Sequence, residues 1–148
     1  MYRPRNVPPD AGSLPNYLDY ELRAIERGMV EDIAGLTEAI VVVCSDETTT
    51  LTTGADKVTF RMPYAFYLTS VKASLTAAQT SGTAFQVDVN NGGTSVLSTK
   101  LTIDNNELTS VTAATPAVIS APYFAADAVV TIDIDTCTAS QSKGLKVT

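Results

Sequence analysis

The stretch Phe85-Gln86-Val87-Asp88-Val89-Asn90-Asn91-Gly92-Gly93 carries the clearest structural pattern in this chain. Its first residues alternate between apolar and polar side chains, which is the period of a strand with one buried face. The Asn-Asn-Gly-Gly sequence that follows predicts a type I′ hairpin turn, because two successive residues there can adopt positive φ. The stretch therefore predicts an antiparallel sheet.

The same alternation recurs from about residue 39 to residue 148. Val130, Ile132 and Ile134, for example, alternate with Thr131 and Asp133. We expect strands over residues 39–44, 57–62, 66–76, 84–90, 95–103, 107–112, 129–134 and 144–148. Turn signals lie at Asp104-Asn105-Asn106, Pro63, Pro116 and Pro122. Short strands with regular turns and no helical pattern between them predict a mainly β domain, an antiparallel β-sandwich of jelly-roll type.

Residues 14 to about 40 follow a helical period instead. Apolar residues recur every three or four positions, at Leu18, Leu22, Ile25, Met29, Ile33, Leu36 and Ile40. Ser13 suits a helix N-cap, and Pro15 suits the first turn. Gly28 and Gly35 each cost about 1 kcal/mol relative to Ala. We therefore expect one good helix from 14 to about 27 and a weaker segment to about 37.

The leader before this helix contains Pro4, Pro8 and Pro9, which predict an extended arm. The sequence thus divides into residues 1–38, a Pro-rich arm with an amphipathic anchor helix, and residues 39–148, the β-sandwich. An apolar stripe on such a helix must be buried against the β-domain, another copy or another protein.

Composition excludes several classes of function. The formal net charge of −6 disfavours binding to nucleic acid, whose phosphates repel an acidic protein. Histidine is absent, which removes the commonest general base and the commonest metal ligand. We expect no enzyme activity, no metal and no cofactor. No run of 18 apolar residues exists, so we expect no membrane span. The N-terminus is not a signal peptide, so we expect the protein to be assembled in a cytoplasm.

The two cysteines, Cys44 and Cys137, are not in a C-x-x-C pair. Buried free thiols are the default interpretation. A disulfide between them is the alternative, and it would need an oxidising compartment.

Asp88, Asp133 and Asp135 form the best candidate for a cation site, since alternating carboxylates on one strand face resemble oxygen ligands for calcium. Ordinary exposed carboxylates on a half-buried sheet are favoured over that interpretation. A second acidic group, Asp46, Glu47 and Asp56, flanks a run of threonines. Because the chain has no Trp to stack a sugar, a glycosidase site there is disfavoured.

The remaining candidates concern contacts with partners. We predict that docking on a partner uses Arg3, Arg5, Tyr17, Leu18, Leu22 and Ile25. We predict that a subunit interface uses Met29, Ile33, Leu36, Tyr64, Phe66 and Tyr67. A solvated tail is the alternative for the two arginines, simple packing for Tyr17, and the protein's own core for the aromatic residues 64–67.

Several segments resemble small virion structural proteins of tailed phages. The N-terminal segments are Arg3-Pro4-Arg5-Asn6-Val7-Pro8-Pro9-Asp10, Leu14-Pro15-Asn16-Tyr17-Leu18 and Glu21-Leu22-Arg23-Ala24-Ile25-Glu26. The segments of the β-region are Ser45-Asp46-Glu47-Thr48-Thr49, Phe60-Arg61-Met62-Pro63-Tyr64, Leu97-Ser98-Thr99-Lys100-Leu101-Thr102-Ile103 and Thr131-Ile132-Asp133-Ile134-Asp135. The resemblance implies a virion component with an N-terminal anchor and a trimeric outward-facing β-sandwich. It implies no catalytic residue.

The sequence therefore predicts a trimeric fibre or fibre-like protein of a phage tail or head–tail connector. Its partners would be two further copies and another virion protein, such as a tail adaptor, a portal-proximal protein or a capsid protein. A trimeric head decoration protein is the first alternative. A module that binds a host surface glycan is the second.

Overall fold

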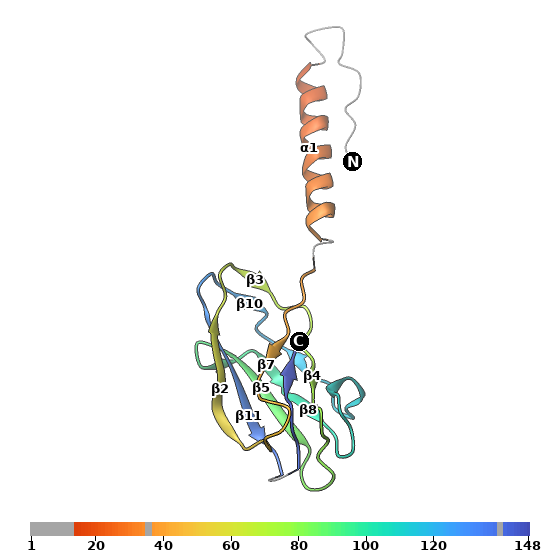
Figure 1. Cartoon of the computed structure of the whole chain (residues 1–148). Coiled ribbons are helices and arrows are strands. Elements are labelled where there is room, and N and C mark those ends of the chain that lie inside the picture. The colour runs from red at the N-terminus through yellow and green to blue at the C-terminus, as the bar shows by residue number, and fades with distance from the viewer. Residues whose placement is uncertain (1–13, 35–36, 139–140) are drawn as a thin grey trace. The chain divides into compact units, whose positions relative to one another are not determined.

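The computed structural model describes residues 14–34, 37–138 and 141–148 (Figure 1). The chain divides into two compact units, Met1–Ala39 and Ile40–Thr148. The described part is rich in strands, which lie in several antiparallel sheets, and it has a helix near the N-terminus. The predicted mainly β class with a preceding helix is thereby confirmed.

Helix α1 runs without interruption over Leu14–Ala34. It passes through Gly28, so the prediction of a first helix that ends near residue 27 is wrong. One glycine costs only about 1 kcal/mol, and good helix formers on both sides continue the hydrogen-bond ladder across it. The predicted N-cap Ser13 and the predicted breaker Gly35 lie outside the described residues.

The largest sheet of the described chain has five strands. Strand β11 (Val129–Thr136) lies between β2 (Gly54–Arg61) and β5 (Phe85–Asn91) and is antiparallel to both. The other side of β5 pairs with β6 (Thr94–Ser95) and with β8 (Leu101–Ile103). The strands of this sheet account for most of the regular structure in the β unit.

The predicted hairpin turn after β5 is confirmed. Asn91 pairs with Thr94, and the two residues between them, Gly92 and Gly93, have φ of 58° and 81°. Two successive residues in this region define a type I′ turn, whose twist matches that of the flanking strands. Gly-Gly supplies this geometry without a steric cost, since neither residue has a Cβ.

Three smaller antiparallel sheets complete the described β unit. The first has the order β1 (Val42–Val43), β12 (Lys146–Val147) and β4 (Ala73–Ser74). The second pairs β10 (Tyr123–Phe124) with β3 (Phe66–Tyr67). The third pairs β7 (Leu97–Thr99) with β9 (Val118–Ile119).

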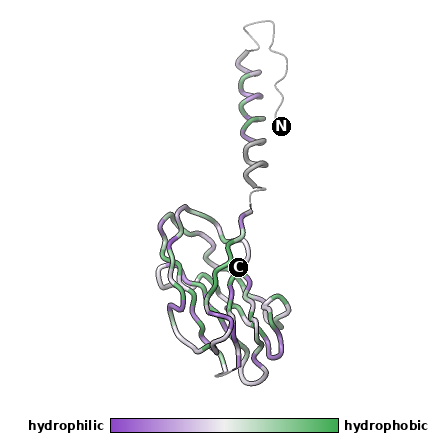
Figure 2. Tube along the Cα trace, in the orientation of Figure 1, coloured by the Kyte–Doolittle hydropathy of each residue, from purple (hydrophilic) through white to green (hydrophobic). Residues whose placement is uncertain are grey.

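A single hydrophobic core collects side chains from these sheets. Phe85, Val87 and Val89 point into it, as the alternation in the sequence predicts, and so do Ile132 and Ile134. Figure 2 shows the hydrophobic positions that recur along the strands of this unit. The largest fully buried side chains of the core are Phe85, Phe124, Leu101, Ile103, Ile132, Ile134 and Leu145.

The strand expected over residues 95–103 is broken into three pieces. Ser95 pairs with Asn90 and Leu101 pairs with Val87, so the chain between them has more residues than β5 needs opposite it. The surplus leaves the sheet as β7 and pairs with β9 instead. This detour of the chain over residues 96–100 interrupts the margin of the sheet. At its end the chain comes back to β5, and Lys100 lies beside that strand.

Three other strand predictions differ from the structure. Residues 107–112 contain a 3-10 turn, η1 (Ser110–Thr112), because the Thr109 hydroxyl accepts a hydrogen bond from the Val111 N–H and caps the turn. The segment 66–76 forms two short strands, β3 and β4, which join different sheets. The predicted strand 39–44 is reduced to the two residues of β1.

Candidate interaction surfaces

The helix presents an apolar surface on its first half. Leu18, Leu22 and Ile25 all remain exposed, and Leu22 is 62% exposed. On a helix these positions fall within about 60° of one another, so they form one stripe. Asp19 and Arg23 lie on a different face and form an ion pair, with the Arg23 Nε 2.9 Å from the Asp19 Oδ2. The stripe predicted as a docking surface is therefore present on the described helix.

Other residues of the predicted docking surface and interface are not described to the same extent. Arg3, Arg5 and Leu36 lie outside the described residues. Met29 and Ile33 are within α1, but only their backbone is described. Tyr17 is half-buried. The roles assigned to these residues stay predictions.

A second exposed surface is aromatic and lies on β3 and β10. Tyr67 pairs across the ladder with Tyr123, and their ring centroids are 5.2 Å apart at an interplanar angle of 50°. Tyr67 is 69% exposed and Tyr123 is 50% exposed, so both rings reach solvent. Tyr64, which precedes β3, is exposed as well. These three tyrosines form what we call the tyrosine surface.

The Phe66 side chain points to the face of the β3–β10 ladder opposite to that of Tyr67. Its ring stacks on that of Phe124, with centroids 4.7 Å apart, and it packs against the hydrophobic core. The structure therefore places Phe66 in the protein's own packing, whereas Tyr64 and Tyr67 face outward. Sequence reasoning missed Tyr123 and Phe124. Their Pro-Tyr-Phe context resembles Pro63-Tyr64 near Phe66, and that likeness was the available signal.

The acidic candidates Asp88, Asp133 and Asp135 do come together, since β5 and β11 place Asp88 opposite Asp133. Asp88, however, is only 3% exposed, so the expectation of an exposed carboxylate is wrong for this residue. Its Oδ1 accepts hydrogen bonds from the Ser95 hydroxyl at 2.7 Å and from the Val89 N–H at 2.8 Å. These donors make burial of the carboxylate tolerable.

The positive charge of Lys100 neutralises part of the negative charge of this acidic group. Its Nζ lies 2.6 Å from the Asp135 Oδ2 and 3.0 Å from the Asp88 Oδ2. These two contacts, the one to Asp135 foremost, raise the pKa of Lys100. Asp133 is held separately, because it accepts from the Asn90 side-chain amide at 2.9 Å and from the Asp56 N–H at 2.7 Å. The Lys100 ammonium group thus lies between Asp88 and Asp135, where a bound cation would have to lie. We interpret these ion pairs as contributions to the stability of the sheet.

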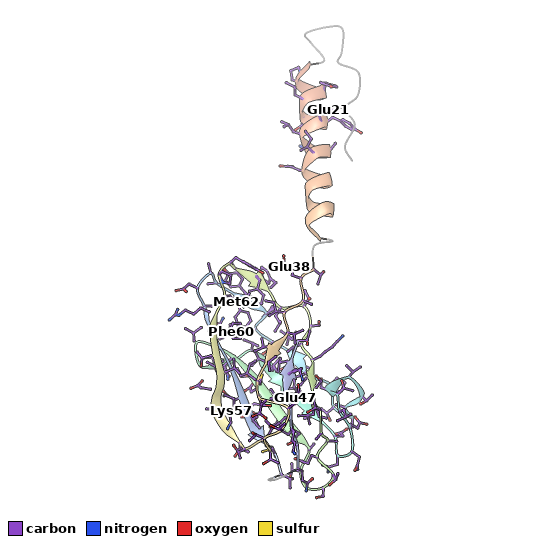
Figure 3. The ribbon with its side chains drawn as sticks, in the orientation of Figure 1. Glu21, Glu38, Glu47, Lys57, Phe60 and Met62 are labelled. Carbon is purple, nitrogen blue, oxygen red and sulfur yellow. The ribbon has the colours of Figure 1, made fainter. Side chains whose placement is uncertain are left out.

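The other acidic group forms a loop fastened by hydrogen bonds. Asp46 accepts from the Thr49 N–H at 2.5 Å, the Thr49 hydroxyl at 2.7 Å and the Thr48 N–H at 2.7 Å. Donation by Thr49 and then Thr48 holds the pKa of Asp46 well below its usual range. Glu47 is paired with Lys146, which lowers its pKa, and a contact with Thr76 lowers it further. Figure 3 labels Glu47 in the β unit.

Both cysteines are free thiols, as predicted, but they are half-buried where full burial was expected. The Cys44 Sγ donates to the Val42 carbonyl at 3.5 Å, and the Cys137 Sγ donates to the Leu51 carbonyl at 3.6 Å. Burial raises the pKa of Cys44 to about 11 and raises that of Cys137 as well. Both thiols therefore stay protonated near neutral pH and are poor nucleophiles.

Within residues 14–34, 37–138 and 141–148, no group of three or more His, Cys, Asp or Glu side chains is placed to hold a metal ion. The described helix is not apolar enough over a sufficient length to cross a membrane. Comparison with protein-family models, with curated proteins and with solved structures finds no match.

Proposed function

We propose that this chain is a structural subunit of a phage particle, a trimeric fibre or fibre-like protein. Its N-terminal arm and α1 attach it to the particle, and its β unit projects. The observation that carries the proposal is the exposed stripe of Leu18, Leu22 and Ile25. Burial of apolar surface contributes about 25 cal/mol per Å², so a stripe of this kind favours association with another protein surface.

The β unit suits a projecting module. We infer that its sheets form the two layers of an antiparallel β-sandwich of jelly-roll type. Support comes from the core, in which Val147 of β12 and Ala73 of β4 join the same cluster as Phe85 of β5. Side chains from different sheets that share one core are the usual packing of two facing sheets.

A structural role also fits the chemistry of the polar groups. Asp46 and Glu47 are stabilised as carboxylates by their donors, so neither is suited to act as a general acid near neutral pH. The thiols are protonated, and the chain has no histidine to activate a hydroxyl. We propose that the chain has no enzymatic activity.

Deletion of residues 1–37 tests the attachment. We expect the truncated chain to be absent from assembled particles, because it lacks the arm and the stripe. A finer test replaces Leu18 and Leu22 with Ser in the full chain, and its matched control replaces Asp19 with Asn and Arg23 with Gln on another face of α1. Quantitative mass spectrometry of purified particles should show loss of the first variant and normal levels of the control.

Normal incorporation of the truncated chain would contradict the attachment proposal. The same measurement separates the fibre from the head decoration protein by copy number, since decoration requires a number comparable to that of the major capsid subunit. A copy number in that range would favour the decoration role over the fibre.

The tyrosine surface favours a second candidate function, the binding of a host surface glycan. Tyr67 and Tyr123 present two exposed rings on neighbouring strands, and aromatic rings of this kind stack on the apolar faces of sugars. A glycan array probed with the full chain tests this role. Tight, specific binding that is lost on Tyr67→Ala but kept on Tyr17→Ala would support it, and the absence of binding would remove it.

A further inference from the structure

Strand β1 and the two residues before it carry an exposed apolar surface that no part of the proposed attachment uses. Val41 is 58% exposed, Val43 is 59% exposed, and Ile40 beside them is exposed too. They belong to the run Ile40-Val41-Val42-Val43, four consecutive β-branched residues. Surface valines are ordinary when single, but three neighbouring exposed aliphatic side chains form a contact patch. We call this patch the β1 patch.

The position of β1 in its sheet makes this patch accessible. The order β1, β12, β4 leaves β1 at the margin of its sheet. Val42 turns inward and packs against the hydrophobic core, so Val43 points to the opposite face of the strand. Its cross-strand neighbour Lys146 is ion-paired with Glu47. The charge next to the patch is therefore already balanced within the same chain.

Charge indicates what covers the patch. Each chain has a formal net charge of −6, so copies of this chain repel one another wherever their acidic surfaces meet. Residues 39–45 contain no charged side chain. Within this segment identical chains can touch through uncharged side chains alone, with the acidic Glu38 and Asp46 at its two ends. A strongly charged partner would gain nothing from such a surface, whereas a second copy of the same apolar segment would.

The covalent link between α1 and β1 also favours a second copy of the chain as the partner that covers the patch. Helix α1 ends at Ala34 and β1 begins at Val42, and a link of this length spans at most roughly 30 Å when fully extended. Where the helices of three copies attach at one place on the particle, each β1 segment stays within roughly 30 Å of that place, so the segments stay within roughly 60 Å of one another. Such confinement raises the effective concentration of the segments for one another.

We propose that the β1 patch is a subunit interface, and that Ile40, Val41 and Val43 of one copy pack against the same residues of two other copies. The inference rests on the proposed trimer and deepens it, because it names the β-unit surface through which the copies meet. The contact is made by side chains around a common axis and needs no exchange of strands.

The test replaces Val41 and Val43 with Thr in the full chain. Threonine keeps the branched shape and strand preference of valine but makes burial of the side chain unfavourable. The matched control replaces Val111 and Val118 with Thr, since these valines are also exposed and lie outside the patch. Analytical ultracentrifugation over a dilution series measures the concentration at which half of the chains are trimeric.

We expect the Val41→Thr, Val43→Thr variant to require at least a tenfold higher concentration to form trimers, while the control matches the unchanged protein. Because the trimer dissociation constant scales with the square of that concentration, the change corresponds to roughly 2.8 kcal/mol per trimer. Equal trimer formation by the variant would overturn the inference and leave the proposed trimer standing. Equal weakening of both variants would also overturn it. A monomeric unchanged protein at all concentrations would overturn the inference and the proposed trimer together.

Cross-linking gives a second, independent measurement. In the full chain with Cys44→Ser and Cys137→Ser, Val43→Cys places a thiol in the patch, and Val118→Cys serves as the control. Mild oxidation should link pairs of chains through position 43 and leave one chain of each trimer unlinked, since three thiols at an axis form a single disulfide. Linkage at position 118 with none at position 43 would contradict the proposed contact.

Discussion

Lys100 is the residue on which the buried polar group of the five-stranded sheet depends. It reaches Asp88 and Asp135 at hydrogen-bond distance, and Asp88 is almost fully buried. A carboxylate in this position is stable only while its donors and its counter-charge remain. Removal of the ammonium group therefore has a larger effect than removal of a surface charge.

We predict that Lys100→Met lowers the free energy of unfolding by about 2 kcal/mol, because it removes charge-assisted hydrogen bonds and leaves the Asp88 carboxylate without its cation. Chemical denaturation at pH 7 measures the change. Lys72→Met is the matched control, since Lys72 is an exposed lysine, and its effect should stay within about 0.5 kcal/mol. Equal effects of the two substitutions would show that Lys100 contributes only as a surface charge.

The Cys44 thiol gives a prediction on pH. Burial raises its pKa from 9.0 to about 11, so the unfolded chain loses this proton before the folded one does. The stabilising contribution of the neutral thiol is complete below pH 9 and is lost as the pH rises through about 11. In the Cys137→Ser variant, the rate of alkylation by iodoacetamide should reach half its plateau near pH 11 in the native protein and near pH 9 in urea. Coincident midpoints would refute the shift.

Gly92 and Gly144 have similar backbone conformations but different surroundings. Gly92 has φ of 58° and Gly144 has φ of 67°, so alanine meets similar backbone strain at both positions. A Cβ at Gly92 would have no heavy atom within 4 Å, whereas at Gly144 it would overlap Thr76 and Glu47. Both branches of the Thr76 side chain lie in the way, so rotation of that side chain does not relieve the overlap.

We predict that Gly92→Ala costs about 1 kcal/mol of the free energy of unfolding and that Gly144→Ala costs about 3 kcal/mol. The first value reflects the left-handed backbone alone, and the second adds the overlap. Urea denaturation monitored by tyrosine fluorescence measures both. A cost for Gly92→Ala as large as that for Gly144→Ala would mean that backbone strain outweighs the lack of space.

The sequence predicted elements best where the pattern was local. Alternation placed Phe85 and Val87 in the core, and Asn-Gly-Gly chemistry located the hairpin turn. The local pattern could not reveal the detour of β7, because the detour depends on pairing with β9, about twenty residues farther along the chain. It also could not show that Asp88 is buried, since the lysine that makes burial tolerable lies across the detour.

The helix and the surfaces show a similar division. The spacing of Leu18, Leu22 and Ile25 predicted their common stripe, because a regular helix fixes that spacing. Tyr123 was missed as the partner of Tyr67, because cross-strand pairing between distant segments leaves no trace in either segment alone. Gly28 does not end the helix, since a helix is interrupted only when the summed preference of its neighbours also fails.

At the scale of the whole molecule, the two units differ in how they are stabilised. The β unit has one core of buried side chains drawn from all its sheets. The exposed stripe on α1 means that the helix gains little from burial within its own unit. The stability of the β unit should therefore be independent of the residues before it.

We predict that a chain beginning at residue 40 unfolds cooperatively, with a midpoint within about 3 °C of that of the β transition in the full protein. Differential scanning calorimetry at a concentration where both are monomeric measures this. A drop of 10 °C or more would show that residues before 40 pack on the β unit.

The detour of β7 has a consequence for how the protein behaves when it is crowded. It interrupts the outer margin of the five-stranded sheet, where β6 and β8 lie, and so denies a foreign strand a continuous row of backbone partners. The opposite margin, β2, bears the charged side chains of Asp56, Lys57 and Arg61, and charged side chains on an edge strand disfavour its pairing with a foreign strand. We therefore expect the chain to stay dissolved at high concentration without fusing sheet to sheet into insoluble fibrils.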